Sequence, residues 1–389
     1  MVKVESGEKR NYGIDLLRIV SMFMVVMLHI LPLEVGKILS IKKEVVYFLE
    51  CACFCAVNCY ALISGYVGVR KNKRSYSNII YLWFQVVFIS LMAYLALIII
   101  DPTQFRWANL LKVFFPVLMQ EYWYFSAYFL LFLVMPVLNY IVTTLPKKKL
   151  QILFVTTFPL ISILNVIKHV EVFGILNGYS FLWLAILYML GAYIYLYNPF
   201  KNSTSKSCFR NYWISIILLF LTRIVIGLLS KRFVGLERYV NIFLDYPSVF
   251  VLLSSIFLLA GFSKLNIKPN KIIPKISSLT FGIYLIHLTD VFRIYILDHL
   301  YYVYSYNIFV LVLLIMLFAI IVYLISLAID YIRLNIFNVL RIKQLSQAID
   351  RRYVLVVDKI CNIFNKNDTE SDSNNNIEPE LNKDDVDAQ

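Results

Sequence analysis

Residues 11–30 read NYGIDLLRIVSMFMVVMLHI, an apolar stretch that nevertheless contains Asp15, Arg18 and His29. About 20 predominantly apolar residues are enough to cross the hydrocarbon core of a bilayer as an α-helix. Ionisable side chains are costly inside that core, and they face the protein interior or a water-filled cavity rather than lipid. The stretch therefore predicts a membrane-spanning helix whose three ionisable groups point into a helix bundle and have a function there.

Helical geometry places the three groups on one face. The eleven steps from Arg18 to His29 rotate by about 1100°, within about 20° of complete turns. Asp15 precedes Arg18 by three residues, so their side chains are neighbours on the helix surface. His29 lies about 21 Å beyond Asp15 along the axis. Simpler roles exist for each group: Arg18 can extend to the inner headgroups, Asp15 can cap the helix or pair with Arg18, and His29 can join two helices as a neutral imidazole.

The whole chain has the composition of a polytopic membrane protein. Of its 389 residues, 60% are hydrophobic and only 16% are charged, and the mean hydropathy is +0.72. Soluble domains average about 25% charged residues. We expect an all-α fold with about ten transmembrane helices, each in an apolar window of sufficient length. These windows are 14–33, 45–69, 77–100, 122–143, 150–167, 180–197, 212–230, 246–262, 278–297 and 307–329.

Lysine and arginine residues predict how these helices are oriented. With the N-terminus in the cytoplasm, the cytoplasmic segments up to residue 277 hold 17 Lys and Arg, against nine in the opposite segments. Cytoplasmic loops carry an excess of these residues, so both termini are predicted to be cytoplasmic in a plasma membrane. The net charge of +13 is spread over short loops rather than gathered on one basic face, so we expect no nucleic-acid partner.

We assign residues 1–330 to the membrane domain and divide the remainder into two segments. Residues 331–363 are basic and amphipathic, which suits a helix on the anionic inner leaflet. Residues 364–389 are polar and acidic, and a segment of this composition is expected to be disordered. The first apolar stretch is longer than the core of a signal peptide, so we expect it to be retained.

The cysteine residues do not indicate a metal site. Cys51, Cys55 and Cys59 are four residues apart on one helix face, but no histidine accompanies them. Small residues on a helix face let neighbouring helices approach closely, and we assign these cysteines that role. The sequence therefore predicts no bound metal.

Four stretches resemble, in order and spacing, the motifs of acyltransferase family 3, a family of bacterial membrane acyltransferases. The resemblance spans residues 10–330, which is nearly the whole membrane domain. In the first, Arg18 and His29 are separated by ten residues, as in the family. The four stretches are IDLLRIVSMFMVVMLH (14–29), FCAVNCYALISGYVGVR (54–70), YWYFSAYFLLFLVMPVLNY (122–140) and ISSLTFGIYLIH (276–287).

This resemblance implies transfer of an acyl group, usually acetyl from cytoplasmic acetyl-CoA, to a hydroxyl of an extracytoplasmic or lipid-linked glycan. His29 and Arg18 match the family's essential His and Arg, and Asp15 lies beside them. We therefore expect an O-acyltransferase of the plasma membrane with these three catalytic residues. Its donor is acetyl-CoA or another acyl-CoA, and its acceptor is a capsule, an exopolysaccharide or a similar glycan.

The sequence departs from the family pattern at two places. RKNKR (70–74) stands where many members place Arg-x-x-Arg, and members that act on large glycans often carry a Glu in the Trp motif, which is absent here. Many of those members also append an extracytoplasmic hydrolase-like domain. No such domain is recognisable in this sequence, so we expect the membrane domain to perform the whole transfer.

The expected reaction explains why ionisable groups are buried. A sugar hydroxyl attacks a thioester poorly unless a base takes its proton, and such a base contributes about 10²–10⁴-fold to the rate. The phosphates of acyl-CoA call for basic residues at the inner face. Arg70, Lys71, Lys73 and Arg74 are the candidates for binding them.

Five further residues are candidate site residues. Ser64, Trp123, Tyr284 and His287 belong to the family-like motifs, and Arg223 falls near the middle of the seventh window. A structural role remains the alternative for His287, and a buried pair with a carboxylate remains the alternative for Arg223.

Two other functions remain open from the sequence. A glycan or lipid-linked-sugar exporter also needs many spans and intramembrane arginines, but it predicts inverted repeats with broken helices, and we find no internal symmetry. The second is a non-catalytic assembly or sensor protein, for which the presence of Asp15, Arg18 and His29 on one helix face has no explanation. The sequence does not identify the acceptor sugar, the acylated hydroxyl or the oligomeric state. It also does not distinguish acetyl from succinyl transfer, or direct transfer from a mechanism with an acyl-histidine intermediate.

Overall fold

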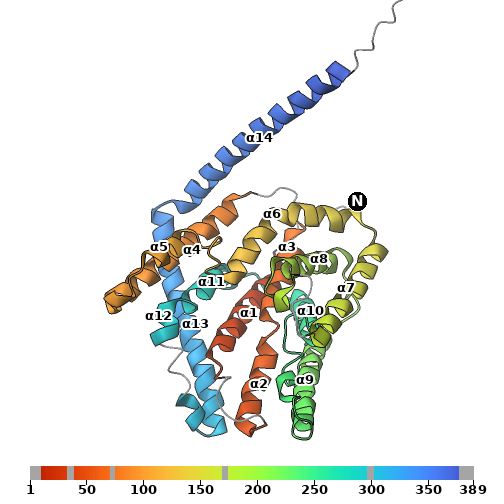
Figure 1. The fold of residues 1–389 in the computed structure, drawn as a ribbon, viewed down its shortest axis with the longest axis vertical. Coiled ribbons are helices and arrows are strands. Elements are labelled where there is room, and N and C mark those ends of the chain that lie inside the picture. The colour runs from red at the N-terminus through yellow and green to blue at the C-terminus, as the bar shows by residue number, and fades with distance from the viewer. Residues whose placement is uncertain (1–9, 33–38, 71–74, 169–173, 296–301, 376–389) are drawn as a thin grey trace, which may run out of the picture.

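The protein is a bundle of α-helices (Figure 1). A computed structural model describes residues 10–32, 39–70, 75–168, 174–295 and 302–375, and no β-strand occurs in these ranges. The helices are α1 Tyr12–Ile30, α2 Ile41–Cys53, α3 Ala56–Gly68, α4 Ser77–Ile100, α5 Trp107–Phe114, α6 Trp123–Thr144, α7 Lys147–Lys168, α8 Phe181–Tyr197, α9 Ser205–Ser230, α10 Val249–Ser263, α11 Ile272–His287, α12 Asp290–Tyr295, α13 Ile308–Val339 and α14 Ile342–Asn375.

Several of these helices are suited to a bilayer. Within the described ranges, six stretches are long and apolar enough to cross a membrane: α1, α2 with α3, α4, α6, α9 and α13. Three further apolar helices, α8, α10 and α11, have 17, 15 and 16 residues and are shorter than a full span. The expected all-α membrane fold is confirmed, with six candidate spans by this measure.

Helix α1 lies at the centre of the bundle, where it packs against α2, α3, α10, α11 and α13. Its start is fixed by Asn11, whose side chain accepts hydrogen bonds from the backbone N–H groups of Gly13 and Ile14 at 2.9 and 3.2 Å. The same side chain donates to the carbonyl oxygen of Ser263, at the end of α10, at 2.8 Å. This N-cap therefore sets both where α1 begins and how it meets α10.

The predicted window 45–69 is not one continuous helix, because it breaks at Phe54 and Cys55 between α2 and α3. A helix break inside a membrane frees backbone groups, which neighbouring side chains then satisfy. Here the hydroxyl of Tyr212 on α9 donates to the carbonyl oxygen of Ala52 at 2.7 Å. The aromatic ring of Phe54 stacks on Tyr246 with centroids 4.8 Å apart. Tertiary contacts thus stabilise a break that no proline or glycine announces.

The window 278–297 is also interrupted, because α11 ends at His287 and α12 starts at Asp290. The hydroxyl of Thr289 donates to the carbonyl oxygen of Ile286 at 2.8 Å. Such local bonds from Thr side chains compete with the helical pattern, which accounts for the interruption.

The predicted boundary at residue 330 falls inside a helix, since α13 continues to Val339. Asp330 and Arg333 are both buried and form an ion pair at 2.7 Å. Gln85 and Tyr81 of α4 complete their hydrogen bonds at 3.1 and 2.9 Å. A paired and hydrogen-bonded charge is tolerated in an apolar interior, so the helix continues past the charged residues instead of stopping there.

Helix α14 runs past the boundary predicted at 363 and ends at Asn375, while residues 376–389 lie outside the described residues. It projects away from the bundle (Figure 1). Its first turns are fixed to the start of α4, where Asp350 accepts hydrogen bonds from the Ser75 hydroxyl at 2.5 Å and the Tyr76 N–H at 3.2 Å. Because adding residues to a nucleated helix costs far less than starting one, the helix extends into the segment expected to be disordered.

Two glycines let α3 and α8 approach closely. A Cβ atom on Gly65 would lie 1.8 Å from the carbonyl oxygen of Tyr188, and one on Gly191 would lie 2.0 Å from the carbonyl oxygen of Leu62. Both obstacles are backbone atoms, which cannot rotate away as a side chain can. Small residues at such crossings are the usual means of close helix packing in membranes.

We expect Gly191→Ala to destabilise the protein by about 1–3 kcal/mol or more, as overpacking of a tight contact does. Gly227→Ala on α9 is the matched control, because its new Cβ would meet only the Leu39 side chain, at 3.2 Å. The measurement is thermal unfolding of both variants in detergent. A Gly191→Ala protein as stable as wild type would contradict the close α3–α8 contact.

Candidate functional site

A cavity of about 600 Å³ opens between the helices. Its walls come from α1, α3, α4, α6 and α11, together with residues just before α8 and α10. This volume lies within the range of about 300–1,000 Å³ typical of small-molecule sites. Arg18 and His29, eleven residues apart on α1, both line it, so the predicted inward stripe is confirmed for these two residues.

The cavity has two chemically different ends. At one end lie Gly68 at the end of α3, Ser75 and Asn78 at the start of α4, and Ser278 early in α11. We call this the basic end. Arg18 lines the cavity, Arg70 lies two residues after Gly68, and Lys275 lies three residues before Ser278. At the other end lie Trp123, Tyr179 and Tyr246, at or just before the starts of α6, α8 and α10. We call this the aromatic end.

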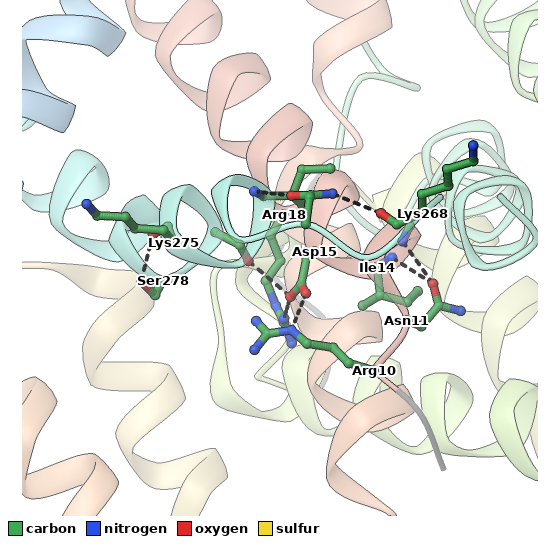
Figure 2. A network of polar contacts seen from close by, with 12 residues as sticks. Arg10, Asn11, Ile14, Asp15, Arg18, Lys268, Lys275 and Ser278 are labelled. Carbon is green, nitrogen blue, oxygen red and sulfur yellow. Dashed lines mark hydrogen bonds and ion pairs between the residues drawn. The ribbon is translucent and has the colours of Figure 1, made fainter. Parts of the chain in front are cut away.

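Asp15 organises the charges of the basic end (Figure 2). Its carboxylate is 3% exposed and accepts from Arg10 Nε at 2.5 Å and from Arg18 Nη1 at 2.8 Å. The hydroxyl of Ser277 on α11 donates to the same carboxylate at 3.3 Å. The hydrogen bond to Asp15 raises the pKa of Arg10, which lies just before α1. The predicted Asp15–Arg18 pair is therefore present, and it leaves the guanidinium of Arg18 at the cavity wall.

His29 presents one ring nitrogen to the cavity. Its Nδ1 is 2.8 Å from the carbonyl oxygen of Val25, one turn earlier in α1. A carbonyl oxygen only accepts, so Nδ1 carries the proton and Nε2 holds the lone pair. The side chain is exposed, and because it lines the cavity, this exposed surface faces the cavity. A neutral imidazole with a free Nε2 in a cavity can accept a proton from a bound hydroxyl.

His287 supports His29 from α11. Its Nε2 lies 3.3 Å from Nδ1 of His29, and the two rings meet edge to face with centroids 5.0 Å apart. Its own Nδ1 lies 2.6 Å from the carbonyl oxygen of Ile283, so Nδ1 is the protonated nitrogen here too. Nε2 of His287 is then an acceptor for the His29 Nδ1–H. This second acceptor fixes the tautomer of His29 in which Nε2 stays unprotonated.

The basic stretch 70–74, predicted to bind the donor, is described by the structure at its first residue. Its first residue, Arg70, follows α3 and lies over the ring of Tyr195, with 5.4 Å from guanidinium carbon to ring centroid. Lys71, Lys73 and Arg74 lie outside the described residues. The residues on both sides of the loop, Gly68 and Ser75, line the cavity.

The remaining candidates divide into two groups. Ser64, Trp123 and Tyr284 line the cavity, and the Ser64 hydroxyl donates to the Tyr60 carbonyl at 2.9 Å. Arg223 is elsewhere: it forms a buried pair with Glu44 at 2.7 Å, and its guanidinium lies 3.4 Å from the centroid of the Tyr47 ring. The carboxylate partner that the sequence left unidentified is therefore Glu44.

Several cavity residues escaped the sequence analysis, among them three tyrosines. Tyr60 lines the cavity, and its hydroxyl donates to the carbonyl oxygen of Arg18 at 2.6 Å. Tyr179 and Tyr246 lie in non-helical segments before α8 and α10. Nothing in their spacing marks them, because loop residues gain a shared site only from the tertiary fold.

Comparison with known proteins identifies the family of this chain. A protein-family model described as an acyltransferase domain matches residues 11–330, which is 320 of the 389 residues. No significant match was found among curated proteins or among solved structures. The matched range begins just before α1, includes Arg18, His29 and His287, and ends at the buried pair of α13. The chain therefore belongs to acyltransferase family 3 and is a membrane acyltransferase.

Proposed function

We propose that this protein transfers an acetyl group from cytoplasmic acetyl-CoA to a hydroxyl of an extracytoplasmic or lipid-linked glycan. The observation that carries the proposal is one cavity that runs from a basic end to an aromatic end, with His29 in its wall. An anionic donor suits the basic end, and a sugar acceptor suits the aromatic end. Family membership supports the reaction class, and we assign the protein to the plasma membrane.

We propose further that the basic end faces the cytoplasm. The short helices α8, α10 and α11, together with α7, raise the six candidate spans to the ten predicted from the sequence. Both termini then lie in the cytoplasm, in agreement with the excess of Lys and Arg on that side. Helices shorter than a full span are accommodated because non-helical segments that line a cavity are tolerated at membrane depth.

Donor binding is assigned to the charges of the basic end. The phosphates of acetyl-CoA would meet the basic residues of the 70–74 stretch, because Gly68 and Ser75 on either side of it line the cavity. Arg18 stands deeper and is held by Asp15, so its planar guanidinium is oriented before the donor arrives. The narrow arm of the cofactor can then carry the thioester along the cavity toward His29.

His29 acts as the general base in this proposal. As the acceptor hydroxyl oxygen attacks the thioester carbonyl, Nε2 of His29 takes the hydroxyl proton. The carbon–sulfur bond breaks, and the departing CoA sulfur receives the proton from Nε2, which restores the neutral imidazole. His287 is a positioning residue, since its Nε2 accepts from Nδ1–H of His29 throughout. The products are the O-acetylated glycan and CoA.

The topology is tested with reporters. We expect a reporter fused after Lys149 to be cytoplasmic and one inserted beside Arg232 to be exposed outside, because four of the ten predicted spans precede Lys149 and seven precede Arg232. Accessibility to a membrane-impermeant label measures both. Labelling of the Lys149 site from outside intact cells would contradict the orientation.

Donor binding is tested by changing Arg70, Lys71, Lys73 and Arg74 together to Gln. Each lost charge-assisted hydrogen bond should cost about 1.5–3 kcal/mol, so the affinity for acetyl-CoA should fall by at least tenfold. The control changes residues 147–149, another basic group at the start of a helix, to Gln. Binding to purified protein is measured by calorimetry, and equal affinity in both variants would remove the loop from the donor site.

The catalytic role of His29 is tested by His29→Gln, which keeps a polar group but removes the proton acceptor. We expect near-normal CoA binding and a transfer rate reduced by at least about 10²-fold. His287→Gln should reduce the rate less, because Val25 still holds Nδ1 of His29.

The measurement for both variants is O-acetyl content per repeat unit of the surface glycan, by NMR of cells that carry each variant. An exporter would instead change the amount of glycan at constant O-acetyl content. Wild-type acetylation per repeat in His29→Gln would refute the proposed function.

A further inference from the structure

We propose that Trp123, Tyr179 and Tyr246 form the acceptor subsite, and that it admits a single terminal sugar ring of the glycan. The inference rests on the proposed function and deepens it. The three rings come from segments far apart in the chain and converge at one end of the cavity. Ring centroids are 4.7 Å apart for Trp123 and Tyr179, 4.9 Å for Tyr179 and Tyr246, and 6.3 Å for Trp123 and Tyr246.

The fold holds this cluster in place. Gly178 has φ +93°, and a Cβ atom there would lie 2.4 Å from the Cβ of Tyr246, so the two segments meet where only glycine fits. Asn58, fully buried, donates to the carbonyl oxygen of Tyr246 at 2.9 Å and accepts from Nε1 of Trp183 at 2.9 Å. Phe54 stacks beneath Tyr246. A satisfied buried polar network rigidifies its surroundings, so the Tyr246 segment is held in place before a ligand binds.

The chemistry of this end favours a neutral sugar. Among the described residues that line the cavity, Arg18 is the only lysine or arginine, and it belongs to the basic end. A phosphate would therefore find no cation among the aromatic rings. Tyr and Trp combine a large apolar face with a polar tip, which matches the C–H face and the hydroxyl groups of a pyranose. Tyr179 is 46% exposed, so a ligand can reach its ring.

The aromatic cluster leads toward the proposed base. Trp123 contacts Tyr124, Tyr124 contacts Tyr284, and Tyr284 contacts His287, with centroids 5.5, 6.1 and 6.4 Å apart. His287 in turn contacts His29. A sugar stacked at the aromatic end thus lies along the wall that ends at the imidazole of His29.

The cavity volume limits how much of the acceptor enters. About 600 Å³ is typical of a site for one small molecule, and the donor's acyl arm must share this space. A sugar inside a long chain would have to bring both neighbours into the cavity. A terminal residue needs the least of this space, because it enters as a single ring.

The experiment measures transfer from radiolabelled acetyl-CoA by the purified full-length protein in detergent. The acceptor is the source organism's own surface glycan, freed of O-acyl groups with mild alkali. We expect Trp123→Ala to raise the acceptor KM about tenfold, from the loss of stacking area, with the donor KM within about twofold of wild type. Trp123→Phe should recover most of the affinity. Trp213→Ala, at a half-exposed tryptophan on α9, is the matched control and should change neither KM.

The requirement for a terminal sugar is tested with the same glycan after mild acid has cut it into short fragments. At equal total sugar, the rate at low acceptor concentration should rise with the number of chain ends. Tyr179→Ala repeats the KM test at an exposed position, in case Trp123→Ala fails to fold.

The outcomes separate the two proposals. If both alanine variants keep the wild-type acceptor KM, the proposed subsite is wrong. If the rate follows total sugar instead of the number of chain ends, the proposal that a terminal sugar enters is wrong. Neither result contradicts the proposed function. Absence of transfer by the wild-type protein overturns the proposed function, and the subsite with it.

Discussion

The buried carboxylate of Asp15 is the constraint around which the site is built. An ionised carboxylate removed from water is strongly destabilising unless it is paired and hydrogen-bonded. Asp15 meets that condition through two guanidinium groups and the Ser277 hydroxyl. These bonds fix Arg18 at the cavity wall, and they tie the first turns of α1 to α11. The same two helices then carry His29 and His287, so one interaction near the start of α1 sets the register in which the two imidazoles meet.

Irregular backbone is the second element of the architecture. The bundle tolerates a break between α2 and α3 because Tyr212 satisfies the carbonyl of Ala52, and it tolerates a non-helical segment before α10 because Asn58 satisfies the carbonyl of Tyr246. Both departures lie where they line or support the cavity. This is the condition under which non-helical backbone persists at membrane depth. The aromatic end therefore depends on hydrogen bonds that lie outside the cavity itself.

In the proposed function, charge and shape divide the cavity between two substrates. Arg70 follows the end of α3 and Lys275 lies near the start of α11, whereas Trp123, Tyr179 and Tyr246 lie where α6, α8 and α10 begin. Because the chain reverses direction from helix to helix, these two sets of ends fall on opposite sides of the bundle. His29 is reached from both, which is the arrangement that direct transfer between a cytoplasmic donor and an acceptor on the other side requires.

The sequence by itself determined the all-helical membrane fold, since apolar windows of sufficient length have few other solutions. It also determined that Arg18 and His29 share one face of α1, because helical periodicity is a local property. Tertiary structure alone decided which distant groups meet the ionisable residues: His287 beside His29, Ser277 beside Asp15, and Glu44 beside Arg223.

The aromatic end also could not be read from the sequence. Trp123 was visible within a motif, but Tyr179 and Tyr246 lie in non-helical segments that have no periodicity to place them. The break at Phe54 was hidden for a related reason, as the bond that stabilises it comes from Tyr212, 160 residues away. Local pattern fixes which face a side chain takes on its own helix. Contacts between distant segments depend on how all the helices pack together, and only the folded structure supplies them.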